Sequence, residues 1–276
     1  MTQTVLITGC STGFGKLAAK TFAEKGWNVI ATMRSPEKET ELVDSDQMLV
    51  VRLDVSDEAS IANAVELGLS RFGSLDVVVN NAGYGSNAMF EQSPDASIRA
   101  MYETNVFGVM NVMRATLPHL RKQGAGRVIN VTSMAGLLGL PGNGVYSSSK
   151  YAVEGLTESL ALEYRDLGIQ FKTIAPGAFS TTAFMDNIET RVSDGDEDLR
   201  AHSEKLRAHF ASLAHGGTPQ DPQMVADKIF ECATEETPVH NPVGADADGL
   251  YKLINSVDDR ETFINIIADR FLPSAN

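Results

Sequence analysis

Short apolar segments rich in β-branched residues alternate with amphipathic segments along the first 180 residues, and this alternation constrains the fold most. The apolar segments lie at 4–9, 28–34, 48–55, 75–83, 126–133 and 170–177. Helical patterns follow most of them, at 14–25, 57–71, 95–121 and 144–167. A repeated strand–helix order predicts βαβ units and a parallel sheet. Because the strands are apolar on both faces, we predict a doubly wound α/β fold with helices on both faces of the sheet.

The pattern changes after residue 180. Residues 180–220 contain no clear strand, and charge is concentrated in the segment SDGDEDLR. A helix is expected at 221–234, a weak strand at 239–243 and a short helix at 261–272. We predict a single domain over 1–276, with a helical insertion at about 180–220 that forms a lid over the substrate. A simple solvated face is the alternative for the charged run.

The charge balance restricts the possible partners. Lys and Arg number 23 and Asp and Glu 36, which gives a net charge of −13. Such a surface repels phosphate backbones and anionic lipid, so we expect neither nucleic acid nor a membrane as a partner. Any anionic ligand must be held by a local basic or dipolar site.

Cysteine and histidine give no indication of a metal site. Cys10 and Cys232 are far apart in the sequence, and the five histidines show no metal-ligand spacing. We therefore expect no metal and a reducing compartment. No apolar run approaches the roughly 18 residues of a membrane span, and the first strand begins by Thr4. We expect a cytoplasmic protein.

A glycine-rich turn follows the first predicted strand, in the segment TGCSTGFG at residues 8–15. Glycine at the first position permits a tight turn, and the later glycines allow close approach of backbone and helix. Backbone N–H groups at the start of the next helix can then hold a pyrophosphate. At this place in a βαβ unit, the turn predicts a Rossmann-type dinucleotide site. The candidate residues are Gly9, Ser11, Thr12, Gly13, Phe14 and Gly15.

The end of the second strand favours NADP(H) over NAD(H). An acidic residue here would bind the ribose 2′-hydroxyl of NAD, whereas an arginine accommodates the 2′-phosphate of NADP. Met33 occupies the acidic position and Arg34 follows it. NAD(H) is the weaker alternative, with Arg34 as an ordinary surface residue. Asp54 and Val55, after the third strand, are expected beside the adenine, although Asp54 could instead cap the helix near 57.

Tyr146 and Lys150 stand four residues apart at the start of a predicted helix, so they share one face. A tyrosine that transfers protons near pH 7 needs its pKa lowered by roughly three units, or about 4 kcal/mol. An ammonium about 4 Å away at an effective dielectric constant of about 20 supplies roughly this amount. Ser133 ends the fifth strand, and Asn81 and Gly83 end the fourth, at the same predicted edge. Together these residues predict a catalytic cleft.

In this combination the sequence resembles the short-chain dehydrogenase/reductase family. The motifs TGxxxGxG, NNAG, Ser, YxxxK and PG occur in the family's order over residues 4–182. The segments VTSMAGLLGLPGNGVYSSSKYAVEGLTESLA and TGCSTGFG with ATMR further resemble the hydroxysteroid and retinol dehydrogenase branch. The chain departs from the common YxASK form at Ser148, and the branch resemblance fades beyond residue 182.

The resemblance implies the role of each site residue. Tyr146 would be the general acid in ketone reduction and the base in alcohol oxidation. Lys150 would lower the pKa of Tyr146 and bind the nicotinamide ribose, and Ser133 would hydrogen-bond the substrate oxygen. Asn105 would anchor a water molecule in the proton relay. The remaining implied cofactor contacts are Asn81, Ala82, Gly83, Pro176, Gly177, Phe179 and Thr181.

The expected substrate is a bulky apolar ketone or secondary alcohol, such as a steroid or retinoid. Apolar residues surround the predicted site, in 134–142 and after the sixth strand at Phe179, Phe184 and Met185. Ordinary loop packing is the alternative for these residues. Surplus apolar positions on the helices near 95–121 and 144–167 predict a homodimer or homotetramer, with a thicker single-chain core as the alternative.

Two other functions are possible on this fold. A non-catalytic dinucleotide-sensing protein would not need Tyr146, Lys150 and Ser133, which this chain retains. An NAD-using epimerase or dehydratase of the extended branch would favour a TGxxGxxG turn and a larger substrate domain. The sequence therefore favours an NADP(H)-dependent oxidoreductase that moves hydride between the nicotinamide and a carbonyl or hydroxyl carbon.

Overall fold

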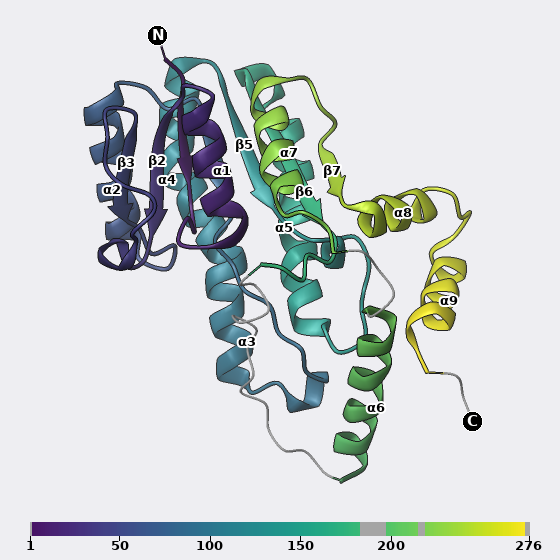
Figure 1. Ribbon diagram of the computed structural model, residues 1–276. Helices are drawn as coiled ribbons and strands as arrows, with labels where there is room; N and C mark the ends of the chain where they lie inside the picture. The colour runs from purple at the N-terminus through teal and green to yellow at the C-terminus, as the bar shows by residue number, and fades with distance from the viewer. Residues whose placement is uncertain (1, 183–196, 215–218, 274–276) are drawn as a thin grey trace.

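A seven-stranded parallel sheet forms the centre of the molecule (Figure 1). The computed structural model describes residues 2–182, 197–214 and 219–273. The strand order is β3-β2-β1-β4-β5-β6-β7. The strands are β1 (Thr4–Ile7), β2 (Asn28–Met33), β3 (Met48–Arg52), β4 (Val77–Asn80), β5 (Gly126–Val131), β6 (Ile169–Pro176) and β7 (His240–Val243). The predicted doubly wound α/β fold is therefore confirmed.

Helices cover both faces of this sheet. One face packs against α1 (Gly13–Glu24) and α7 (Gln223–Thr234). The other packs against α2 (Glu58–Phe72), α4 (Gly108–Gln123) and α5 (Gly144–Glu163). The strand order reverses direction between β1 and β4, which opens a crevice at the carboxyl edge of the sheet.

The first strand explains why the sheet needs two helical layers. Val5 and Ile7 join the apolar cluster on the α1 side, whereas Leu6 joins the cluster on the α2 side. All three side chains are fully buried. Successive residues of a strand point to opposite faces, so a strand that is apolar at every position must be covered on both sides.

The predicted helix at 95–121 is interrupted. It consists of α3 (Asp95–Tyr102), a π-helical turn over Glu103–Phe107, and α4. The turn adds a residue to the helical repeat, and such bulges are often found at functional sites. Asn105 lies within it.

The C-terminal part contains more helix than the sequence predicted. Within the expected lid the structure describes α6 (Glu197–Ala214), whereas residues 183–196 and 215–218 lie outside the described residues. The strand and helix expected near the end are β7 and α9 (Arg260–Phe271), but α8 (Ala245–Ile254) was not predicted. Its sequence mixes Asp and Gly with only four larger apolar residues, so its periodicity is weak.

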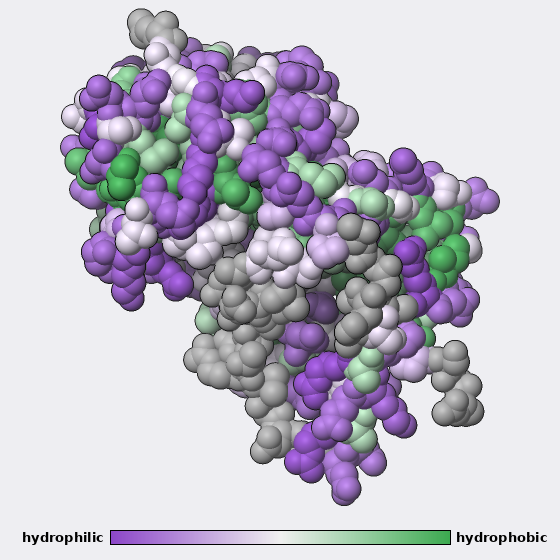
Figure 2. All heavy atoms as spheres, viewed as in Figure 1, coloured by the Kyte–Doolittle hydropathy of each residue, from purple (hydrophilic) through white to green (hydrophobic). Residues whose placement is uncertain are grey.

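The visible surface is mainly hydrophilic, with an apolar patch near α8 and α9 (Figure 2). Exposed apolar side chains there include Ile264 and Leu272. In the part of the chain that the structure describes, every helix is too short or too polar to cross a membrane.

Candidate active site

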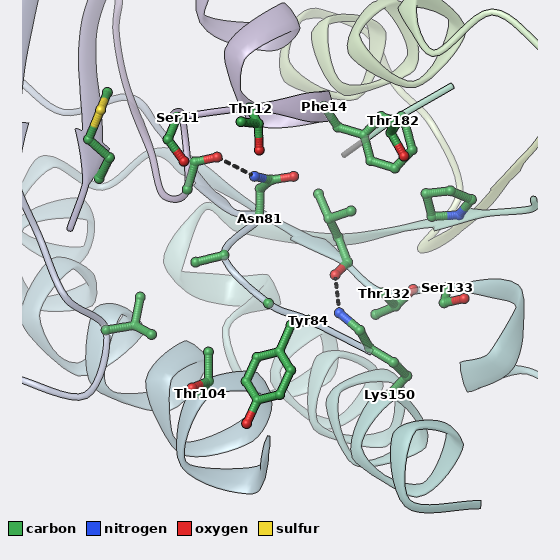
Figure 3. A pocket seen from close by; sticks show the side chains of 18 of the residues that line it. Ser11, Thr12, Phe14, Asn81, Tyr84, Thr104, Thr132, Ser133, Lys150 and Thr182 are labelled. Carbon is green, nitrogen blue, oxygen red and sulfur yellow. Dashed lines mark hydrogen bonds between the residues drawn. The ribbon is translucent and has the colours of Figure 1, made fainter. Parts of the chain in front are cut away.

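A cavity of about 790 Å³ lies at the carboxyl edge of the sheet, where the strand order reverses. Its wall combines the β1–α1 turn, the ends of β2 to β6 and the start of α5 (Figure 3). Most of the predicted site residues line it: Gly9, Ser11, Thr12, Gly13, Phe14, Arg34, Asp54, Val55, Asn81, Ala82, Gly83, Ser133, Tyr146, Lys150, Pro176, Gly177 and Phe179. Gly15, Asn105 and Thr181 do not.

The glycine-rich turn brings backbone N–H groups to this cavity. Gly9 and Gly13 have φ angles of 73° and 57°, which favour glycine. The side chain of Thr12 at the N-cap of α1 makes no capping hydrogen bond, and the first turn of α1 contains no acidic residue. The positive end of the helix is thus available to an anion.

Gly15 lies behind the cavity wall and allows α1 to approach strand β4. A Cβ atom at this position would lie 2.4 Å from both Asn81 Nδ2 and the carbonyl oxygen of Gly9. Asn81 Nδ2 in turn donates to the carbonyl oxygens of Thr8 and Gly9, at 2.9 and 3.1 Å. Gly15 therefore serves close packing rather than direct lining of the cavity.

The ends of β2 and β3 form the far end of the cavity. Met33 is buried at the position where an acidic residue would select NAD, and the exposed Arg34 follows it. Arg34 makes no ion pair with any residue that the structure describes. Burial opposes ionisation of Asp54, but hydrogen bonds from Ser56, with help from Arg34, hold its pKa below the ordinary value. Asp57, rather than Asp54, caps α2.

Tyr146 and Ser133 meet at the catalytic end of the cavity. Ser133 follows β5, and its hydroxyl accepts a hydrogen bond from the N–H of Ala135 at 3.1 Å. Burial raises the pKa of Tyr146 to about 12, against the lowering effect of its hydrogen bond with Ser133. The lowered pKa predicted for Tyr146 is not found, because the loss of solvent outweighs the hydrogen bond in this arrangement.

Lys150 lies one helical turn after Tyr146 and is 6 % exposed. Its Nζ atom donates to the carbonyl oxygen of Val131 at 3.0 Å (Figure 3) and lies 5.8 Å from the centroid of the Tyr146 ring. Burial lowers the pKa of Lys150 to about 8, although the nearby Glu154 acts in the opposite direction. A Cβ atom at Gly83 would lie 3.1 Å from Asn105 Oδ1 and 3.5 Å from this ammonium, so glycine here avoids crowding Asn105.

Asn105 lies behind the cavity wall instead of lining it. Its Oδ1 accepts from the N–H of Tyr84 at 3.1 Å, and its Nδ2 donates to the carbonyl oxygen of Tyr84 at 2.9 Å. Nδ2 also lies 3.2 Å from Ser149 Oγ. The side chain therefore ties the segment after β4 to α5, because its amide matches both backbone groups of Tyr84.

Sequence reasoning missed several lining residues: Leu53, Ser56, Tyr84, Ala100, Thr104, Val131, Thr132 and Thr182. Tyr84 directly follows the NNAG motif and Thr132 directly precedes Ser133, so both could have been found by extending the motifs by one residue. Thr182 lines the cavity where Thr181 was predicted. No signal in the sequence distinguishes these two threonines, because the loop conformation decides which one faces inward.

Part of the apolar mouth predicted around 134–142 forms core packing instead. Leu138 is fully buried in a cluster with Leu250, Phe263 and Ile267 of the C-terminal helices. The alternative of ordinary loop packing therefore holds for Leu138. Phe184 and Met185, also predicted at the mouth, lie outside the described residues.

Comparison with known proteins identifies the family. Residues 3–192 match the family model described as short chain dehydrogenase. The chain belongs to the short-chain dehydrogenase family. Its membership confirms both the resemblance drawn from the motifs and the predicted enzyme class, an oxidoreductase. A similar member is the 3-ketodihydrosphingosine reductase of Bacteroides thetaiotaomicron, 42% identical over 185 residues, which cover 67% of this chain and 66% of that protein.

Solved structures share the whole architecture of this chain. A short-chain dehydrogenase from Streptomyces avermitilis has a TM-score of 0.82 and 33% identity, covering 98% of this chain and 99% of that one. The structure of ElxO with NADP bound has a TM-score of 0.73 and 28% identity, covering 90% and 100% of the two chains. The family fold thus extends well beyond the matched motifs, into the C-terminal part of the chain.

Proposed function

We propose that the protein is an NADP(H)-dependent oxidoreductase that interconverts a bulky apolar ketone and its secondary alcohol. The observation that carries this proposal is the meeting of Tyr146, Ser133 and Lys150 in the same cavity as the glycine-rich turn. A phosphate-binding turn positions a dinucleotide, and a phenol paired with a hydroxyl can bind a carbonyl oxygen. When bound, the nicotinamide supplies or accepts the hydride.

Tyr146 transfers the proton in this proposed reaction. Its phenol donates a proton to the substrate oxygen during reduction and accepts one during oxidation. The Ser133 hydroxyl hydrogen-bonds the same oxygen and stabilises the charge that develops on it. A tyrosine with a pKa of about 12 holds its proton firmly, so proton transfer needs a nearby positive charge.

Lys150 supplies that positive charge. With a pKa of about 8 it is mostly protonated at pH 7. Its ammonium, held at the carbonyl oxygen of Val131, has further hydrogen atoms with which to hold the hydroxyls of the nicotinamide ribose. We assign to Asn105 the positioning of the backbone at Tyr84, which lines the cavity.

The preference for NADP(H) rests on Arg34. A buried methionine occupies the place of the acidic residue that would bind a free ribose hydroxyl, and the exposed guanidinium is open to a phosphate. The NADP-bound structure of ElxO supports the binding of such a dinucleotide by this fold. Arg34→Asp should weaken NADPH binding about tenfold or more and favour NADH. An unchanged ratio of the two affinities would show that Arg34 does not select the cofactor.

The substrate class is inferred from the apolar surroundings of the site and from the relatives. Phe179 is buried beside Phe14, with ring centroids 5.4 Å apart, and gives an apolar border to the cavity. The similarity to a 3-ketodihydrosphingosine reductase supports a ketone on a long or bulky apolar skeleton, a class that includes steroids and retinoids. We propose the region 180–220, which includes α6, as the lid of the substrate site.

The deciding experiment follows nicotinamide absorbance with purified protein and three probes: benzil, a long-chain methyl ketone and a ketosteroid. NADPH and NADH are compared separately. Ketone-dependent oxidation of NADPH that is lost in Tyr146→Phe supports the proposal. Tight NADPH binding without turnover of any probe would instead favour the non-catalytic dinucleotide-sensing function.

Exposed apolar residues support assembly into a homodimer or homotetramer through α4 and α5. Phe107, directly before α4, is 49% exposed, and Leu162 near the end of α5 is 69% exposed. Large apolar side chains in such positions are typical of subunit contacts. Sedimentation of the wild type and of a variant with Phe107→Asp and Leu162→Asp tests this proposal, because a wild-type monomer would contradict it.

A further inference from the structure

A buried carboxylate lies directly beneath the catalytic residues. Glu154 is on α5, one helical turn beyond Lys150, and only 4% of it is exposed. The hydroxyl of Thr132 donates to its Oε1. Its Oε2 lies 2.9 Å from Nδ1 of His240, a residue of β7. Glu154 thus joins α5 to two strands of the sheet.

His240 is held between two carboxylates. Nδ1 lies 2.9 Å from Glu154 and Nε2 lies 2.9 Å from Oε1 of Glu158. Only an imidazolium can donate from both ring nitrogens at once. The hydrogen bond with Glu154, together with the charges of both carboxylates, raises the pKa of His240 against the effect of burial. Positive and negative groups therefore alternate in a row that runs from Lys150 through Glu154 and His240 to Glu158 at the surface.

Thr132 connects this row of charges to the catalytic end of the cavity. It stands between Val131, whose carbonyl oxygen accepts from Lys150, and Ser133, whose hydroxyl is bonded with Tyr146. The hydrogen bond that Thr132 donates to Glu154 therefore holds the strand end that carries both contacts.

The surrounding elements contribute few other charges to this row. Among the described residues, the end of β5 is followed by Thr132, β6 presents Thr173, and β7 presents His240. Lys172 of β6 directs its ammonium to the carbonyl oxygen of Thr237 instead. On α5 itself the titratable groups of the row are Tyr146, Lys150, Glu154 and Glu158.

We propose that Glu154 is a positioning residue that keeps the buried Lys150 ammonium charged, and that His240 sets the strength of this support. The proposal rests on the proposed reaction, in which Lys150 must be cationic. An ammonium with almost no solvent contact loses much of its hydration, and a carboxylate one turn away on the same helix offsets part of that loss. A protonated His240 beside Glu154 cancels part of the negative potential that Glu154 produces at Lys150.

The test measures the ionisation of Lys150 directly in the cofactor-free protein. Lysine isotopically labelled at Cε is titrated by NMR, and the Lys150 resonance is identified by its absence from Lys150→Met. Glu154→Gln, which keeps an acceptor for Thr132, should lower the pKa of Lys150 by about one unit. His240→Gln should raise it. Glu163→Gln, an exposed carboxylate at the C-terminal end of α5, is the matched control and should leave the pKa of Lys150 nearly unchanged.

Ketone reduction by NADPH with benzil supplies the second measurement. A shift of about one unit predicts that kcat of Glu154→Gln is about fivefold below the wild type at pH 8 and close to it at pH 6, where Lys150 regains its proton. A structural role alone would lower kcat equally at both values.

The outcomes separate this proposal from the proposed function. Opposite shifts of the Lys150 pKa in Glu154→Gln and His240→Gln support the proposal. A folded Glu154→Gln whose Lys150 pKa equals that of the wild type overturns it. Full turnover by Tyr146→Phe would contradict the proposed reaction. It would not affect the NMR measurement of the Lys150 pKa, which uses the cofactor-free protein.

Discussion

The Nζ atom of Lys150 and the carbonyl oxygen of Val131 lie 3.0 Å apart, so the buried ammonium of α5 is held at the end of strand β5. This contact satisfies one of the three ammonium hydrogen atoms. It also places the cation next to the strand end that carries Ser133. The same burial that makes this lysine useful for catalysis makes it costly for stability.

Lys150→Met should stabilise the cofactor-free protein by about 1–2 kcal/mol at pH 7, after the lost hydrogen bond is counted. The pKa of Lys150 is lowered from 10.5 to about 8 in the folded state. Unfolded chains therefore bind more protons between these values, and wild-type stability rises with pH across this window. The difference in unfolding free energy between Lys150→Met and the wild type should be largest below pH 8 and should shrink towards pH 10. Urea unfolding across this range measures it, and a variant that is less stable at every pH would contradict the explanation.

His240→Gln should show the opposite dependence on pH. Because the folded-state pKa of His240 is raised, its stabilising effect is fully present below the unfolded value of about 6.5 and is lost as pH rises through the folded value. We expect a loss of about 0.5–1 kcal/mol at pH 6, allowing for partial solvent screening, and less at pH 9. Equal losses at both pH values in thermal unfolding would exclude a contribution from the charged form.

Gly15→Ala should damage both stability and dinucleotide binding. The added methyl group would lie 2.4 Å from the backbone oxygen of Gly9, so the phosphate-binding turn would have to move. Overpacking of this kind costs about 1–3 kcal/mol. Gly26→Ala, just beyond the other end of α1 and away from the cavity, is the matched control: its new Cβ meets nothing within 4 Å, and only the φ of 82° opposes it, at about 1 kcal/mol. Binding of NADPH, followed by quenching of protein fluorescence, should fall further in Gly15→Ala than in the control.

Asp246→Ala should loosen the segment that carries Pro176 and Phe179. Asp246 Oδ2 accepts from the N–H of Ala178 at 2.7 Å, and its Oδ1 accepts from Nε2 of Gln220 at 2.8 Å. Without this carboxylate, the segment after β6 loses its direct hydrogen bond to α8 and keeps only the indirect link through Gln220. We expect KM for NADPH to rise about three- to tenfold with a smaller effect on kcat. Asp248→Ala, in the same first turn of α8, is the control. Identical kinetics for the two variants would show that Asp246 does not position this segment.

The sequence predicted the sheet better than it predicted the helical part of the chain. Each of the first six strands contains several β-branched residues. A run that is apolar at every position, such as Val5 to Ile7, can be buried only between two helical layers. The helix α8 was missed because it is held by Leu250 packing on Leu138, a contact between residues more than one hundred positions apart. A contact between residues so far apart in the sequence produces no periodic pattern in the local sequence from which the helix could be predicted.

The residues of the candidate site likewise fall into those that local motifs predict and those that only the tertiary structure places. The glycine-rich turn, Ser133, Tyr146 and Lys150 follow from local motifs, because strand ends and a four-residue helical spacing bring these groups to one edge. Whether Asn105 or Thr181 faces the cavity depends on a π-helical turn and a loop conformation, and neither position lines it.

The amino-acid sequence by itself determined the α/β class, the order of strands and helices, and the residue types at the catalytic edge, since these depend on periodicity and short-range geometry. Only the tertiary structure decided the ionisation of that edge. The pKa of Tyr146 rises and that of Lys150 falls because both groups are buried, and the row Lys150, Glu154, His240 is assembled from a helix and a distant strand. Burial and long-range electrostatics depend on the packed molecule, in which residues 154 and 240 become neighbours.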